Sequence, residues 1–338
     1  MKRTLALCST PFLLAACGEL TSDDAAQEAL DVAEVVAESE PVTSAGGVVF
    51  RFAGLDDGAA VLTREDLYTA QIQAREAGIR AQDANVTTFE GMRAPYAGDV
   101  LEWTDAEREA LTEAMLSVVD KVSLIDSLLP EEVLLVKTGS VVEGGLPHTR
   151  SNAIIFAGGG IPSGDQLTQL FLHELHHVLS RANEDLHDDY FSLIGFVPCA
   201  FEEPDGLRSP RLSNPDAPVY LHYSPAELPG ADGVIPFLHA TRDYDGEGVL
   251  PNYFGFGLVP VTFADGTCTA TIDSPEGLLA PGAAPDFLEK LGGNTGYIIH
   301  PEETLADNFV HWAMEATDLT TPELPEAVGA FWVAAASE

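Results

Sequence analysis

The sequence predicts an α+β fold in which a small mixed sheet packs against helices. Two short apolar runs with β-branched residues, at 132–137 and 152–157, are bounded by Gly and Pro and are typical of strands. They precede a stretch of helical periodicity around residues 171–179, and a second such stretch follows Pro301. The two predicted helices carry most of the residues with recognisable chemistry.

The first of these helices is expected to begin near Ser163. Residues 163–166 have the pattern of a capping box, in which the Ser hydroxyl accepts a free backbone amide and the Gln side chain reaches back to the start of the helix. Five apolar residues fall on one side of this helix and predict a buried stripe: Phe171, Leu172, Leu175, Val178 and Leu179.

The opposite side of the helix carries an HExxH pattern, which runs from His173 to His177. Residues four apart on a helix lie about 40° apart around its axis, so the two imidazoles point to one place. Glu174 flanks that place. Two metal ligands and a base in this arrangement are typical of a zinc hydrolase.

The same pattern is also compatible with a solvated helix surface that binds no metal. Leu167 and Leu170 border the histidine face, which favours a cleft wall over full exposure to water. The histidine face is therefore expected to be the open face of the helix. His176 lies outside the pattern, and we expect it at the surface.

A catalytic zinc ion needs a third protein ligand and one open position. The motif resembles that of the zincin metallopeptidases, which take this ligand either from HExxHxxGxxH or from a Glu on a later helix. Ser180 and Asn183 stand where the first pattern needs Gly and His. Glu303 and Asp307 match the ExxxD arrangement of the gluzincins, the thermolysin-like branch. This resemblance implies a zincin-like fold, with Glu303 as the third ligand and Asp307 holding a ligand histidine through its other ring nitrogen.

Other acidic residues are weaker candidates for the third ligand. Glu184 and Asp188 have the same spacing, but a continuing helix would place Glu184 about 10 Å along the axis from His177, too far to share one ion. Glu202 and Glu203 remain open as alternatives.

The resemblance also implies a reaction. Zinc would lower the pKa of its bound water to about 7, and Glu174 would accept the proton as that water attacks a peptide carbonyl. Gluzincins stabilise the resulting oxyanion with a Tyr or His from outside HExxH. Tyr297 and His300 are the nearest candidates, with a half-buried Tyr and a surface His of no catalytic role as the alternative.

Three further elements are expected around this site. By the same resemblance, a strand before the HExxH helix would form the edge of the cleft and bind an extended peptide through main-chain hydrogen bonds; a plain core strand is the alternative. A capping box at residues 104–107 predicts a packing helix that continues to about Leu129. Thr63 is expected to start another helix.

The N-terminus has the pattern of a bacterial lipoprotein signal. Lys2 and Arg3 precede an apolar stretch, residues 5–16, that is too short to span a bilayer but typical of a signal peptide. The sequence LAAC, which ends at Cys17, resembles a lipobox, so residues 1–16 would be removed and Cys17 would carry the lipid. Gly18 replaces the Asp that retains enteric lipoproteins in the inner membrane, and an outer-membrane anchor in the cell envelope is therefore expected.

Residues 17–47 are predicted to be an acidic linker, because the stretch from Glu19 to Glu40 holds eight acidic residues and no Lys or Arg. Residues 48–338 then form the metallopeptidase domain. The formal net charge of the whole chain is −38, which excludes nucleic acid as a partner by repulsion. Solubility explains this charge most simply, and a salty habitat or a basic substrate are the alternatives.

Two cysteines remain once Cys8 leaves with the signal peptide and Cys17 is lipidated. Cys199 and Cys268 are expected to pair in the oxidising envelope, with two separately buried thiols as the alternative. The bridge would close 69 residues and contribute about 4 kcal/mol in the chain-entropy description. It would link parts of an insertion, at about 184–295, that is expected to be rich in loops because of its Pro and Gly content.

The leading hypothesis is a lipid-anchored zinc metallopeptidase that cleaves a peptide or protein substrate, with His173, His177 and Glu303 as ligands and Glu174 as base. The alternative is a catalytically silent lipoprotein that keeps a zincin fold as a binding or assembly module. Hydrolysis of a non-peptide amide is a third hypothesis. The substrate preference and the oligomeric state do not follow from the sequence.

Overall fold

The computed structural model describes residues 42–43 and 47–337 of the chain. The predicted signal peptide at 1–16, Cys17 and most of the linker at 17–47 lie outside the described residues. Among the helices of the described part, none has both the length and the apolar character that a membrane crossing requires.

The predicted strands at 132–137 and 152–157 are both present, and they lie side by side in a mixed sheet of the described residues. The first pairs in parallel with the second and with the strand near the N-terminus. Short antiparallel strands flank them, and the main path runs β1-β2-β4-β6-β5. The strands are β1 (Val42–Thr43), β2 (Val49–Phe52), β3 (Val100–Leu101), β4 (Glu132–Thr138), β5 (His148–Arg150) and β6 (Ala153–Phe156).

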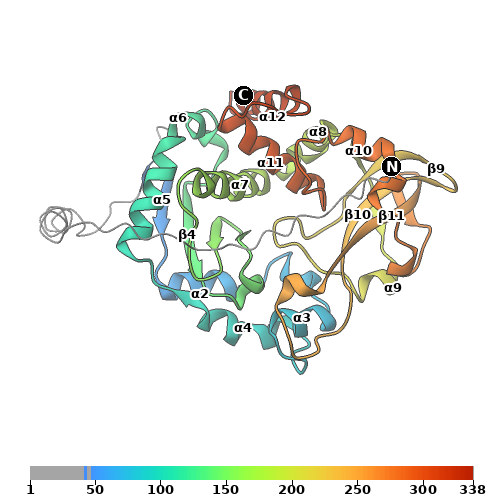
Figure 1. Ribbon diagram of the computed structural model, residues 1–338, viewed down its shortest axis with the longest axis horizontal. Coiled ribbons are helices and arrows are strands. Elements are labelled where there is room, and N and C mark those ends of the chain that lie inside the picture. Colours follow the sequence, from blue (N-terminus) through green and yellow to red (C-terminus); the bar gives the residue numbers. More distant parts are fainter. Residues whose placement is uncertain (1–41, 44–46, 338) are drawn as a thin grey trace, which may run out of the picture. The chain divides into compact units, whose positions relative to one another are not determined.

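Helices cover both faces of this sheet, because successive side chains of β4 point in opposite directions. Leu135 belongs to the core formed with α5 and α7, whereas Val136 belongs to the core formed with α2 and α4. Figure 1 shows α7 on one side of the sheet and α2 and α4 on the other. The bounds of these helices are α2 (Leu55–Thr63), α4 (Phe89–Gly98), α5 (Asp105–Ser117) and α7 (Asp165–Ala182).

Two of the predicted helix boundaries are wrong. The capping box at Thr104 is present, but α5 ends at Ser117 because Val118 leaves the helical backbone, and a separate short helix follows. Thr63 is the last residue of α2 and does not begin a helix. The remaining α-helices are α3 (Ala74–Arg80), α6 (Val119–Val122), α8 (His187–Ser192), α9 (Asp205–Arg208), α10 (Pro285–Lys290), α11 (Pro301–Ala313) and α12 (Glu323–Ala335).

The capping box predicted for α7 is also wrong. The helix begins at Asp165, and its N-cap is Gly164, which makes no side-chain cap. Gly164 has a φ of 58°, a left-handed conformation that glycine adopts without a steric penalty. It therefore serves as the N-cap residue, the role that was predicted for Ser163. The predicted apolar stripe is confirmed, since its five side chains are all 1% exposed or less.

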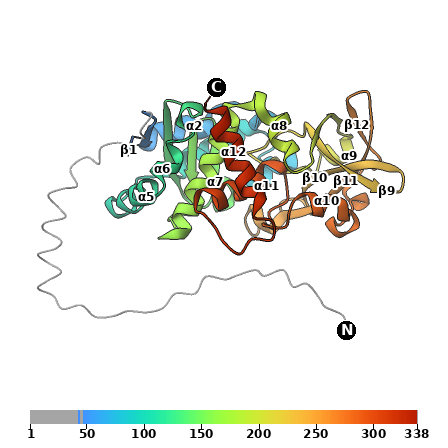
Figure 2. The same cartoon turned by 90° about the horizontal axis from the view of Figure 1, so that it is seen from above.

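The insertion at about 184–295 contains, besides its loops, a second six-stranded sheet in the order β7-β9-β10-β11-β12-β8. Pro236 lies inside β10, at a position where β9 no longer pairs with that strand. A proline is tolerated there, since no partner needs its missing N–H. Figure 2 shows this sheet at the end of the domain away from α5. Its strands are β7 (Val197–Pro198), β8 (Ala200–Glu202), β9 (His222–Leu228), β10 (Ala231–Ala240), β11 (Phe254–Ala264) and β12 (Thr267–Ala270).

The predicted disulfide is confirmed. Cys199, between β7 and β8, is bonded to Cys268 in β12, with their Cα atoms 5.7 Å apart. Both residues are buried in the core of the second sheet. The bond therefore holds the parallel pair β8 and β12 together within the insertion.

Candidate metal centre

The site forms where α7 packs against α11, which lie side by side in Figure 1. Nε2 of His173 is 3.1 Å from Oε2 of Glu303, and Nε2 of His177 is 3.3 Å from the same oxygen. One turn of α7 separates the two imidazoles, so both reach the carboxylate that α11 presents. Residues 130 apart in the sequence are thereby brought into contact.

These three side chains can hold a metal ion. Donor atoms about 2.0–2.1 Å from a tetrahedral metal stand about 3.3 Å from one another, which is close to the two distances between the histidines and Glu303. Nε2 of His177 is buried and makes no hydrogen bond within the described residues, although such atoms are normally paired. A cation at this position would satisfy it.

Each histidine is held from behind by a carboxylate of α11. Nδ1 of His173 is 3.0 Å from Oδ1 of Asp307, and Nδ1 of His177 is 3.0 Å from Oε1 of Glu302. The second oxygen of Glu302 accepts a hydrogen bond of 2.8 Å from Ser180. These contacts fix the ring orientations and leave both Nε2 atoms directed at Glu303.

The pKa values of these groups show how strongly the metal-free cluster attracts positive charge. Burial acts to lower the pKa of His173, but its hydrogen bonds with Asp307 and Glu303 outweigh burial and raise that pKa to about 10. For Glu303, burial acts to raise the pKa, and the neighbouring His177 and His173 bring it well below its usual value. The cluster thus favours either bound protons or a cation in their place.

Glu174 lies next to this cluster and is only 3% exposed. Burial, followed by repulsion from Asp216, raises the pKa of its carboxyl to about 8. Its Oε2 is buried and has no hydrogen-bond partner among the described residues. A carboxyl group that exchanges its proton near neutral pH therefore lies beside the three donors.

The prediction that the histidine face of α7 is open is wrong. Glu174 and His177 are buried, because residues 213–218 of the insertion, here called the covering loop, pass over them. Asn214 in this loop donates a hydrogen bond to Oε1 of Glu303. Oxygen and nitrogen atoms of Glu174, His177 and Asp216 lie within 4.8 Å of one another. Asp216 could not be predicted from the sequence, because nothing local relates it to the motif.

The prediction that His176 lies at the surface is also wrong. Its side chain is fully buried, and its Nε2 is 2.7 Å from the hydroxyl of Tyr190. The ring packs against Phe309 and Trp332. Burial lowers the pKa of His176 to about 3, so the ring is neutral and serves packing between helices.

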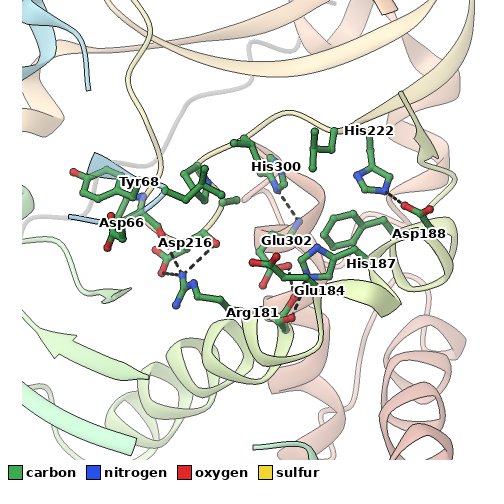
Figure 3. Close-up of a pocket in the computed structure, with 18 of the residues that line it drawn as sticks. Asp66, Tyr68, Arg181, Glu184, His187, Asp188, Asp216, His222, His300 and Glu302 are labelled. Atoms are coloured by element: carbon green, nitrogen blue, oxygen red, sulfur yellow. Dashed lines mark hydrogen bonds and ion pairs between the residues drawn. The ribbon is translucent and has the colours of Figure 1, made fainter. Parts of the chain in front are cut away.

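Tyr297 and His300 fall on different sides of the covering loop. Tyr297 lines a cavity of about 300 Å³ together with His173, Glu174 and Glu303, and its ring centre is 6.0 Å from that of His173. His300 is the N-cap of α11, where its Nδ1 accepts a hydrogen bond of 3.1 Å from the amide of Glu302. It lines a second cavity of about 850 Å³ and not the first (Figure 3).

The alternative third ligands are engaged elsewhere. Glu203 forms an ion pair of 2.7 Å with Arg211, and Glu202 accepts a hydrogen bond from Thr269 within the second sheet. Glu184 lies beyond the end of α7 and lines the larger cavity, as Figure 3 shows. None of these carboxylates belongs to a possible metal cluster of the described residues.

The edge of the first sheet beside the site is β5, one of the strands that precede α7. β6 is paired on both sides, with β4 and β5, so its main chain is not available to a peptide. Thr149 of β5 instead donates its backbone amide to Asp216, at 2.7 Å.

Comparison of the chain with protein-family models, with curated proteins and with solved structures finds no match.

Proposed function

We propose that this protein is a zinc metallopeptidase of the gluzincin type, with a zincin-like fold. His173, His177 and Glu303 are the metal ligands and Glu174 is the general base. The observation that carries the proposal is the contact of both histidines with Glu303 at distances suited to one tetrahedral ion, beside an unpaired Glu174 carboxylate.

The chemistry follows from where these groups lie. Zinc bound by the three residues would supply a Lewis acid that polarises a carbonyl and makes water more acidic. Glu174 takes the proton of the attacking water and passes it to the leaving amine. Asp307 and Glu302 hold the two imidazoles in orientation. Tyr297, at the wall of the adjoining cavity, is the candidate donor to the oxyanion, whereas His300 caps a helix.

The N-terminal sequence supports a cellular setting for this activity. Cleavage before Cys17 and attachment of a lipid there would tether the domain to the envelope, with the outer membrane favoured by Gly18. The acidic linker would then separate the domain from the membrane. Peptides or proteins of the envelope are the proposed substrates.

Glu174→Gln tests the reaction. We expect the variant to bind zinc like the wild type and to lose peptide hydrolysis by about 100-fold or more, because the amide cannot accept the proton. Zinc content and digestion of a peptide library, with and without chelator, measure the two effects. A variant as active as the wild type would rule out the proposed base.

Glu303→Ala is the companion variant, and it tests the ligand set. It should fold, since the helix carries many other buried contacts, and it should lose bound zinc. Full zinc occupancy in the folded variant would exclude Glu303 as a ligand.

One observation favours the alternative of a binding module without turnover. Asp216 brings another carboxylate to within 4.8 Å of His177 and Glu174, and four protein ligands are typical of structural zinc sites that hold no water. The peptidase would need Asp216 to be away from the metal, whereas the binding module would keep Asp216 as a fourth ligand.

A further inference from the structure

The covering loop lies between two cavities. Pro215 and Asp216 line both the cavity of about 300 Å³ beside Tyr297 and the cavity of about 850 Å³ beside His300. Asn214 lines only the first, and Ala217 only the second. The loop thus crosses above α7 at the point where the HExxH residues lie, and Figure 3 shows Asp216 and Arg181 on the side of the larger cavity.

Asp216 occupies two positions that a bound peptide would need. Its Oδ1 accepts hydrogen bonds from the amide and the hydroxyl of Thr149, at 2.7 and 2.6 Å, so it covers the free N–H of the edge strand β5. An extended peptide that added to this edge would need the same N–H. The carboxylate also approaches His177 and Glu174, where the reacting carbonyl would have to lie.

Oδ1 of Asp216 is held by Thr149, which leaves Oδ2 for a cation. The side chain is only 8% exposed, and a carboxylate is rarely buried without a counter-charge. The nearest guanidinium, of Arg181, is 3.9 Å from Oδ1 and donates instead to the carbonyl of Pro215 at 3.1 Å. A metal ion bound at the cluster would give this carboxylate a positively charged partner closer than Arg181.

We propose that Asp216 is a fourth metal ligand and that the covering loop is an inhibitory segment, which must leave the cluster before a peptide can bind. The inference rests on the proposed function and extends it to regulation. With Asp216 in place the metal has four protein ligands and no open position, as in a structural site. With the loop displaced, the two cavities join into one cleft along β5 and the site gains its open position.

Ser213 fixes the start of the loop through hydrogen bonds with the buried Glu76 and Arg80, and the contacts that hold residues 214–216 are polar. Asn214 donates to Glu303, Asp216 is bound by Thr149, and Arg181 donates to the carbonyl of Pro215. A peptide that supplies its own hydrogen bonds to β5 and its own carbonyl to the metal would replace the contact with Thr149 and the proposed ligation by Asp216. The exchange therefore needs no rearrangement of α7 or α11.

Asp216→Asn provides the test, because Asn keeps an oxygen that can accept from Thr149 while losing the charge of a metal ligand. The protein is loaded with Co²⁺, and acetohydroxamate, a bidentate oxygen ligand, is added while the visible absorption of the metal is recorded. We expect the wild type to show little change and the variant to bind acetohydroxamate about 10- to 100-fold more tightly. Zinc affinity of the variant should fall by about 10-fold or more.

Asp205→Asn is the matched control. Asp205 is a carboxylate of the same insertion, and its side chain is 98% exposed, so this variant should behave like the wild type. Equal access of acetohydroxamate to the wild type and to Asp216→Asn would overturn the proposal. The expected change in the Co²⁺ spectrum and in zinc affinity, found while neither the wild type nor Asp216→Asn hydrolyses any peptide, would uphold Asp216 as a ligand and reject the peptidase function.

Discussion

Two adjacent carboxylates at the start of α11 act on different atoms of the metal cluster. Glu303 faces the Nε2 atoms of both histidines, while Glu302 contacts Nδ1 of His177 and accepts a hydrogen bond from Ser180. Successive residues of a helix point about 100° apart, which is why Glu303 reaches the Nε2 atoms of the two histidines and Glu302 reaches Nδ1 of His177. Glu302 thus orients the ring of His177 in the same way that Asp307 orients the ring of His173.

Glu302→Gln is expected to weaken zinc binding by about 10- to 100-fold, because the neutral amide orients His177 less firmly and makes it a poorer donor. Competition with a chromophoric chelator measures the affinity. Glu184→Gln, which alters an exposed carboxylate after the end of α7, serves as control. A folded Glu302→Gln protein with the affinity of the wild type would contradict this role.

The residues found by sequence reasoning at the site are those tied to a local pattern. His173, Glu174 and His177 follow from one turn of helix, and Glu303 and Asp307 from the next pattern along the chain. The place of Asp216 at the site and the burial of His176 could not be predicted, because both depend on contacts between segments far apart in the sequence. Glu302 was overlooked although it is the neighbour of Glu303.

At the level of elements, helices and strands were predicted correctly where their hydrophobic pattern continues over several residues without interruption. α7 and α11 were predicted from their periodicity, and β4 and β6 from runs of β-branched residues. The second sheet was missed because Pro236 and several glycines interrupt its strands. Gly233 is needed in β10, since a Cβ there would lie 2.4 Å from the carbonyl oxygen of Ser224.

The double variant Cys199→Ser/Cys268→Ser tests the contribution of the disulfide to the second sheet. Removing the closure of 69 residues should lower the free energy of unfolding by about 4 kcal/mol, because the unfolded chain gains entropy. Denaturant titration of the oxidised wild type and the variant gives the difference. The wild type under reducing conditions should match the variant, and equal stability of all three would show that the bond does not stabilise the fold.

For the whole molecule, stability should fall as the medium becomes acidic, in part because several histidines are buried in neutral form. Burial lowers the pKa of His148 to about 3, and burial also lowers the pKa of His300, to about 4. The unfolded chain takes up protons on these residues below pH 6.5, whereas the folded protein does not. Their destabilising effect is therefore absent above pH 6.5, and it increases as the pH falls from 6.5 towards the pKa values of the two buried histidines.

His148→Gln isolates one of these groups. Relative to the variant, the wild type should lose about 1.4 kcal/mol of unfolding free energy for each pH unit between 6.5 and about 3. Urea titrations at pH 7.5 and pH 5.5 should show a change of about 1.4 kcal/mol in the gap between the two proteins. A gap that does not depend on pH would mean that His148 is protonated in the folded state.

The long separation between α7 and α11 has a consequence for how the protein matures. The two histidines lie before the insertion and Glu303 after it, so the complete donor set exists only once the insertion has folded and α11 has packed against α7. Partly folded chains would offer a cation two imidazoles and little else. Tight retention of metal would then mark finished molecules, and a chain that stalls in the second sheet would remain metal-free and harmless to its neighbours.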